Sequence, residues 1–297
     1  MKLMSQTPDH TDQAGLAILL KICSGISLII VAALVQQLAA ALPVGQILFF
    51  RSAGMVIAVL ALARFRNRLA ECWQTRRLRA HLVRSSIGFL AIGLNFLALS
   101  LLPLSEAQAL MYLAPILVVI FGVAWLGERA GLHIWIGAGL GFLGVFSILA
   151  IDLTNNIHGG AYIGVIIACL GSITTAAAMI QVRSLARTEP SSTMAFFFGI
   201  VSTIGSLATS YLGWSWPTSS QLGLLGLLGL AGALGHIFMA EAMLRATASY
   251  LAPFEYLNMV WAIIIALLVF EQIPGPLSLA GIGLIIVAAL IASKSKP

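Results

Sequence analysis

Charged residues are scarce in this sequence: of 297 residues only 9% are Asp, Glu, Lys or Arg, whereas 60% are hydrophobic. An ordinary soluble domain carries about 25% charged residues. Its water-facing surface cannot accommodate such an excess of apolar side chains. The same shortage of polar residues excludes an intrinsically disordered chain. The sequence therefore predicts a protein whose surroundings are mostly lipid.

The usual motifs of metal, nucleotide and catalytic sites are also lacking. The three cysteines, Cys23, Cys72 and Cys169, have no paired-ligand spacing, which argues against a disulfide framework and a zinc site. There is no helical metal-binding histidine pair, no Walker A sequence and no recognisable Ser/His/Asp grouping. We therefore expect no metal, no cofactor, no enzymatic activity and no ATP-driven pumping by this chain.

Long apolar runs fill the chain instead. A helix needs about 20 apolar residues to cross the hydrocarbon core of a bilayer. That window predicts ten membrane-spanning helices, at residues 14–34, 44–63, 83–102, 107–126, 132–151, 159–180, 193–212, 221–241, 250–270 and 277–293. Only 64–82 is a sizeable loop. The first run is too long for the apolar core of a signal peptide, so we expect a retained helix.

The basic residues are distributed unevenly over these spans. The net charge is +6, and 14 of the 16 Lys and Arg residues fall at the termini and in the loops of one side. Lys21 and Arg51 are the two that fall inside spans. Basic loops favour the cytoplasmic side, which predicts an inner-membrane protein with both termini in the cytoplasm. The positive charge thus needs no nucleic-acid partner.

An internal duplication accompanies this pattern. A shift of 143 residues places Glu128 on Glu271 and Pro115 on Asn258, each glutamate ending its span. Five spans per half is an odd number, so the second half must be inverted. We predict an all-α membrane protein with two inverted five-helix repeats, 1–151 and 152–297, around a central cavity. Inverted repeats recur in secondary transporters, with the substrate site between the halves.

Polar residues within the spans are the candidates for that site, because they are costly in lipid and normally face a cavity or a partner. The predicted substrate-binding residues are Arg51, Asn95, Gln108, Tyr112, His236, Glu255, Tyr256, Asn258 and Trp261.

Each of these roles has a structural alternative. Arg51 and Glu255 are candidates for an ion pair that only holds two helices together, and His236 for a packing residue. In the functional interpretation, Glu255 binds a cationic group or carries a coupling proton, while Arg51 orients Glu255 or meets a substrate carboxylate. Lys21 is expected to extend to the membrane surface, and Glu106 to lie at a helix start, where the dipole favours an anion.

Four segments resemble the EamA-type transporters of the drug/metabolite transporter superfamily: LPVGQILFFR (42–51), LGER (126–129), APFEYLNMVWA (252–262) and FEQIP (270–274). The nearest subgroup includes S-adenosylmethionine transporters. The resemblance implies ten helices in two inverted halves, with the first, third, fourth, sixth, eighth and ninth lining the cavity. Phe270 and the pair Leu257–Asn258 depart from the family pattern, and the added amide of Asn258 could mark a different substrate.

Together these features predict a secondary transporter that moves a small organic metabolite by alternating access. Its partners would be the bilayer and an amino acid, an S-adenosylmethionine-like compound or a related amphiphile, with a coupling proton as an option. Monomer and homodimer both stay open. The alternatives are a membrane-embedded enzyme acting on a lipid or prenyl substrate, and a passive channel.

Overall fold

The fold is all-α, as predicted. The computed structural model describes residues 10–126, 135–137, 139–141, 143–144, 147, 161–185, 188–243, 245 and 257–293, and these contain helices and no strand. In chain order the helices are α1 (His10–Ala39), α2 (Val44–Phe65), η1 (Leu69–Cys72), α3 (Leu78–Leu101), α4 (Leu104–Met111), α5 (Leu113–Leu126), α7 (Ala161–Leu185), α8 (Ser191–Leu207), η2 (Ala208–Leu212), α9 (Ser219–Met243), α11 (Leu257–Phe270) and α12 (Pro276–Ser293).

The predicted span at 107–126 is interrupted rather than continuous. Helix α4 ends at Met111, Tyr112 forms a turn, and α5 begins at Leu113. Pro115 explains the position of this break, because proline has no N–H to donate to the carbonyl four residues earlier, which is that of Met111. The hydroxyl of Ser172 on α7 donates to the carbonyl of Leu110, at 2.9 Å. A side chain of the neighbouring helix thus satisfies a carbonyl next to the break.

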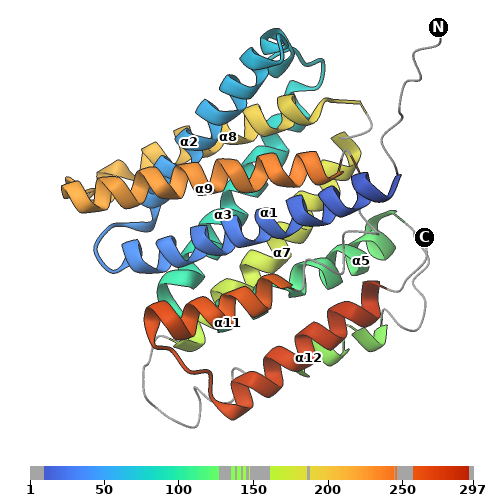
Figure 1. The fold of residues 1–297 in the computed structure, drawn as a ribbon, viewed down its shortest axis with the longest axis vertical. Helices are drawn as coiled ribbons and strands as arrows, with labels where there is room; N and C mark the ends of the chain where they lie inside the picture. Colours follow the sequence, from blue (N-terminus) through green and yellow to red (C-terminus); the bar gives the residue numbers. More distant parts are fainter. Residues whose placement is uncertain are drawn as a thin grey trace, which may run out of the picture.

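Three helix pairs make the most extensive contacts: α3 with α7, α1 with α9, and α2 with α8. Helix α9 also packs on α2, so that it lies between α1 and α2 (Figure 1). The α2–α9 contact is close because glycines meet there. A Cβ atom on Gly54 would lie 2.8 Å from the Cα of Gly229, and small residues allow such an approach in membrane helices.

Six of the helices are long and apolar enough to cross a membrane: Gly15–Ala39, Val44–Phe65, Leu78–Leu101, Tyr162–Val182, Ser192–Tyr211 and Ser219–Met239. Large apolar side chains point outward from them, among them Ile57 and Ile204, as lipid contact requires. The predicted spans at 132–151 and 250–270 lie largely or partly outside the described residues. The count of ten therefore stays a prediction.

The two ends of the helix bundle differ in composition. At one end, Arg64, Arg66, Arg68, Arg76, Arg77 and Arg79 lie at the end of α2, the start of α3 and in between; we call this the basic end. At the opposite end, α2 begins beside the connection between η2 and α9. There the Gln46 amide donates to the carbonyl of Ser215 at 2.8 Å and accepts from its N–H at 3.4 Å.

Candidate functional site

Arg51 and His236 meet in the interior of the bundle. Arg51 is the eighth residue of α2 and is only 6% exposed. Its Nη2 lies 3.2 Å from the Nε2 of His236 on α9. A guanidinium can only donate hydrogen bonds, so Nε2 of His236 must accept this one. The imidazole is then neutral, with its proton on Nδ1, and supplies no negative charge to Arg51.

The other described contacts of Arg51 are with an aromatic ring and a glycine. Its guanidinium lies 5.8 Å from the ring centroid of Phe96 on α3, and its aliphatic stem faces Gly232 on α9. The buried Nε and Nη1 atoms have no hydrogen-bond partner among the described residues. A buried charge is normally paired, because an isolated one is strongly disfavoured away from water. Arg51 is thus a charged donor with unused hydrogen-bonding capacity.

Two asparagines of the predicted site lie against glycines of neighbouring helices. The Oδ1 of Asn95 on α3 occupies the space that a Cβ atom on Gly171 of α7 would take, and Nδ2 of Asn95 donates to the hydroxyl of Thr175 at 3.3 Å. The Oδ1 of Asn258 on α11 occupies the corresponding space over Gly25 of α1. Each glycine leaves room for the side-chain amide of an asparagine on the neighbouring helix. A larger residue in place of either glycine would fill that room.

The other described residues of the predicted site lie on α11, on α4 and at the break between α4 and α5. Trp261 on α11 is half-buried, and its Nε1 has no partner among the described residues. Gln108 on α4 is half-buried, and Tyr112 is buried at the break between α4 and α5. Glu255 and Tyr256 lie outside the described residues, so their predicted roles, including the Arg51–Glu255 ion pair, are untested.

Lys21 does not extend to the membrane surface as expected. Its side chain is buried, and Nζ lies 3.4 Å from the sulfur of Met239 on α9. Glu106 accepts a hydrogen bond from Ser278 of α12 at 2.7 Å, and so links helices of the two chain halves.

Arg84 is a half-buried residue of α3 that the sequence interpretation assigned to a loop. It is the seventh residue of α3, and its guanidinium lies 4.6 Å from the ring centroid of Phe198 on α8. Its Nε and Nη1 atoms are buried without a partner among the described residues. The predicted span 83–102 includes position 84, which was the available signal, although the charge count had assigned Arg84 to the preceding loop.

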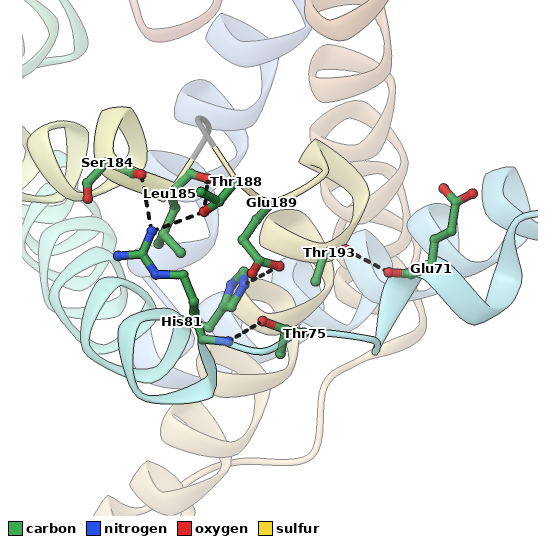
Figure 2. A network of polar contacts seen from close by, with 9 residues as sticks. Glu71, Thr75, His81, Ser184, Leu185, Thr188, Glu189 and Thr193 are labelled. Atoms are coloured by element: carbon green, nitrogen blue, oxygen red, sulfur yellow. Dashed lines mark hydrogen bonds and ion pairs between the residues drawn. The ribbon is translucent and has the colours of Figure 1, made fainter.

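A second polar cluster lies at the basic end and joins α3 to the link between α7 and α8 (Figure 2). His81 and Glu189 are buried, with Nε2 and Oε2 3.3 Å apart. Arg77, one turn before His81, donates to the hydroxyl of Thr188 at 3.0 Å and to the carbonyl of Ser184 at 3.5 Å. Thr193 donates to the carbonyl of Glu71 at 2.6 Å. The sequence pattern did not identify this cluster.

A hollow of about 640 Å³ lies on the outside of this cluster. Its lining residues are Trp73, Gln74, Thr75, Arg76, Arg77, Thr188, Glu189 and Pro190. All of them belong to the η1–α3 and α7–α8 connections, so any movement between these connections changes the shape of the hollow.

Comparison with known proteins gives a family that covers most of the chain. The profile of the EamA-like transporter family matches residues 15–150 and 162–294. The pseudopaline exporter CntI of Pseudomonas aeruginosa is 26% identical over 280 residues, which cover 94% of this chain and 96% of that protein. An S-adenosylmethionine uptake transporter of Rickettsia conorii is 26% identical over 73% of this chain and 72% of its own length.

Two further comparisons agree with these. A riboflavin transporter of Rhizobium johnstonii is 26% identical over 73% of this chain and 70% of its own length. A protein of known crystal structure, 20% identical, superposes with a TM-score of 0.62 over 95% of this chain and 96% of that one. At that identity the superposition establishes a shared fold.

Proposed function

The chain belongs to the EamA-like transporter family of the drug/metabolite transporter superfamily, and from this premise we propose that it is a secondary transporter of a small organic metabolite. It works by alternating access between two inverted five-helix repeats, residues 1–151 and 152–297. Relatives named for pseudopaline, S-adenosylmethionine and riboflavin support a small-molecule substrate. The candidate classes are amino acids, S-adenosylmethionine-like compounds and related amphiphiles.

The observation that carries this proposal is the way helix contacts repeat between the halves. A half-turn that exchanges α1 with α7 and α3 with α9 converts the α3–α7 pair into the α9–α1 pair. These are the two most extensive helix contacts. The same operation converts α2–α9 into α8–α3 and maps α2–α8 onto itself, and each of these is also an extensive contact. Two interchangeable halves are what alternating access around one site needs.

The substrate site in this proposal lies between the halves, near Arg51 of α2 and His236 of α9. Asn95, Gln108, Tyr112, Asn258 and Trp261 provide hydrogen bonds and ring surfaces around it. Glu255 and Tyr256 complete the proposed set, with Glu255 as a cation-binding or proton-carrying group. Buried donors on Arg51 and Trp261 that have no partner among the described residues support this assignment, because buried polar groups normally have partners.

The membrane and the orientation follow from the basic residues. We place the chain in the cytoplasmic (inner) membrane with the basic end in the cytoplasm, because Lys and Arg favour cytoplasmic loops. Monomer and homodimer both satisfy the proposal. The family and the relatives are transporters, which argues against the alternative of a lipid-modifying membrane enzyme.

Counterflow in proteoliposomes tests this function. A thermal-stability screen of the purified chain against amino acids, S-adenosylmethionine and riboflavin selects a ligand, since a ligand stabilises the folded state by mass action. Proteoliposomes loaded with that compound should accumulate its labelled form transiently, and protein-free liposomes should not. Flux that does not saturate and shows no counterflow would indicate a channel, and a chemically altered product would indicate an enzyme.

Within the same assay, Glu255→Gln tests the role of the carboxylate. The amide keeps the size of the side chain and removes its charge and its titration. We expect a large loss of flux or a loss of its pH dependence, whereas an unchanged rate and pH profile would remove Glu255 from the mechanism.

A further inference from the structure

We propose that the hollow at the basic end binds the headgroup of an anionic phospholipid from the surrounding membrane leaflet, with Arg76 and Arg77 as the residues that contact its phosphate. This inference goes beyond the proposed transport function and does not depend on it. It assigns a ligand to a site at the edge of the bundle, apart from the interior residues around Arg51.

The hollow lies at the depth of the lipid headgroups. Its lining residues fall in 73–77 and 188–190. The first group ends where the membrane-spanning segment Leu78–Leu101 begins, and the second lies between the spans Tyr162–Val182 and Ser192–Tyr211. Headgroup layers flank the hydrocarbon core of a bilayer, so residues just outside the spans are at their level. The volume of about 640 Å³ is in the range of small-ligand pockets.

The positive charge of the hollow is not neutralised by a carboxylate of the described residues. Arg76 and Arg77 are exposed, and neither takes part in any of the ion pairs found there. Glu189 also lines the hollow, but its carboxylate is only 7% exposed and lies 3.3 Å from His81. An anionic headgroup fits this arrangement, since basic pockets at the cytoplasmic ends of membrane helices bind such headgroups.

Hydrogen bonds hold Arg77 in position for an anion. Its Nη1 donates to the hydroxyl of Thr188 and to the carbonyl of Ser184, which leaves Nε and Nη2 without a partner among the described residues. The backbone N–H of Arg77 donates to the hydroxyl of Thr75 at 2.9 Å and fixes the start of α3 (Figure 2). The Nε–Nη2 edge of a guanidinium donates two parallel hydrogen bonds to one phosphate. A side chain that is already held loses less conformational freedom on binding.

Apolar side chains next to the hollow favour a lipid over a soluble anion. Trp73 lines the hollow and is 48% exposed, and its ring contacts that of Phe196 on α8, with centroids 6.4 Å apart. Tryptophan is enriched at the level of the headgroups. Leu78 directly follows Arg77, and both Leu78 and Leu82, one turn further along α3, are exposed. An acyl chain gains contact with these side chains, whereas a free anion does not.

Native mass spectrometry of the purified full-length chain tests the proposal. The chain in detergent is titrated with dioleoylphosphatidylglycerol, which is anionic, and with dioleoylphosphatidylcholine, which has the same acyl chains and a zwitterionic headgroup. The first phosphatidylglycerol molecule should bind at least about fivefold tighter than the first phosphatidylcholine molecule. Equal affinities would overturn the proposal, because the two lipids differ only in their headgroups.

Substitutions locate the bound lipid. Arg76→Gln and Arg77→Gln should each weaken the binding of phosphatidylglycerol about fivefold, the factor that one basic residue near an anionic lipid supplies. Arg76 donates no hydrogen bond to the described residues, so its variant tests the charge without disturbing the contacts of Arg77. Arg64→Gln is the matched control, because it removes the same charge from an exposed arginine at the same end but outside the lining of the hollow.

The control decides between a site and a diffuse attraction. Arg64→Gln should leave the affinity for phosphatidylglycerol almost unchanged. An equal effect of all three substitutions would indicate a general attraction of the lipid to the basic end and would overturn the proposal. Unchanged binding in both Arg76→Gln and Arg77→Gln would also overturn it.

A soluble anion is the alternative occupant of the hollow. Inorganic phosphate and glycerol phosphate, each in large excess, should leave the phosphatidylglycerol complex intact, because neither has an acyl chain to contact Leu78 and Leu82. Displacement of the lipid by either anion would assign the hollow to a soluble ligand and overturn the proposal.

Discussion

The imidazole of His81 lies 3.3 Å from the carboxylate of Glu189, and both side chains are almost completely withdrawn from solvent, at 0% and 7% exposed. The distance is that of an ion pair, without the geometry of a hydrogen bond. His81 also contacts the ring of Phe197, with ring centroids 4.8 Å apart and ring planes inclined by 31°. This contact joins α3 of the first half to the α7–α8 link of the second half, and it closes the basic end of the interface between the halves.

Loss of either partner should weaken the contact between α3 and the α7–α8 link and so destabilise the protein. Glu189→Gln should lower the free energy of unfolding by about 1–3 kcal/mol, because His81 then keeps a buried polar ring without its charged partner. Glu71→Gln is the control, since its exposed pairing with Arg68 at 3.9 Å contributes at most about 1 kcal/mol. Denaturant unfolding of both variants measures the difference. A double-mutant cycle of His81→Ala and Glu189→Ala with no coupling would contradict a direct interaction.

The close contact between α2 and α9 should not tolerate a side chain at Gly54. Gly54→Ala places a methyl group 2.8 Å from the backbone of Gly229, and such overpacking costs about 1–3 kcal/mol. Gly223→Ala on α9 is the matched control, because a Cβ atom there meets nothing within 4 Å. The control should be neutral or more stable by up to about 1 kcal/mol, as alanine favours the helix. Equal midpoints of thermal unfolding for the two variants would contradict the predicted clash.

Glu241 should stabilise the basic end in a pH-dependent way. Hydrogen bonds from Arg245 and Arg66 hold the pKa of its carboxyl below the ordinary value. A lowered folded-state pKa means that the stabilisation is complete above the ordinary pKa of about 4.3 and is lost as pH falls through the folded-state pKa. Glu241→Gln should cost about 0.2–1 kcal/mol near neutral pH, and the difference from wild type should vanish in acid. A cost that does not change with pH would rule out this origin.

Cysteine labelling should show opposite sides of the membrane for two exposed positions. In a chain without its native cysteines, Gln74→Cys marks the basic end and Trp216→Cys marks the connection next to Gln46 at the other end. A membrane-impermeant maleimide added to intact cells should modify position 216, and position 74 only after permeabilisation. The reverse pattern would invert the proposed orientation.

Much of the fold is predictable from the sequence because lipid imposes a simple rule on it. Apolar runs of sufficient length must be helices, and α2, for example, begins at the predicted residue 44 and ends two residues past the predicted 63. The interruption at Tyr112 was not predicted, although Pro115 is its physical cause. A span defined by average hydropathy takes no account of a single missing N–H donor.

The candidate site was predictable in part. Rarity of charge within spans singles out Arg51, and the structure pairs it with His236, another predicted residue. Arg84 was not identified because positive charge near a span boundary is typical of loops. The His81–Glu189 contact joins residues more than a hundred positions apart. No local pattern contains that information, since each partner alone looks like an ordinary loop residue.

The hydroxyl of Ser172 links the interruption in the first half of the chain to a helix of the second half. It donates to the carbonyl of Leu110 beside the interruption at Tyr112, so the break between α4 and α5 is tied to α7. A displacement of α7 would act on the joint between α4 and α5 through this hydrogen bond. A single serine hydroxyl thus couples the break between α4 and α5 to a helix from the other half of the sequence.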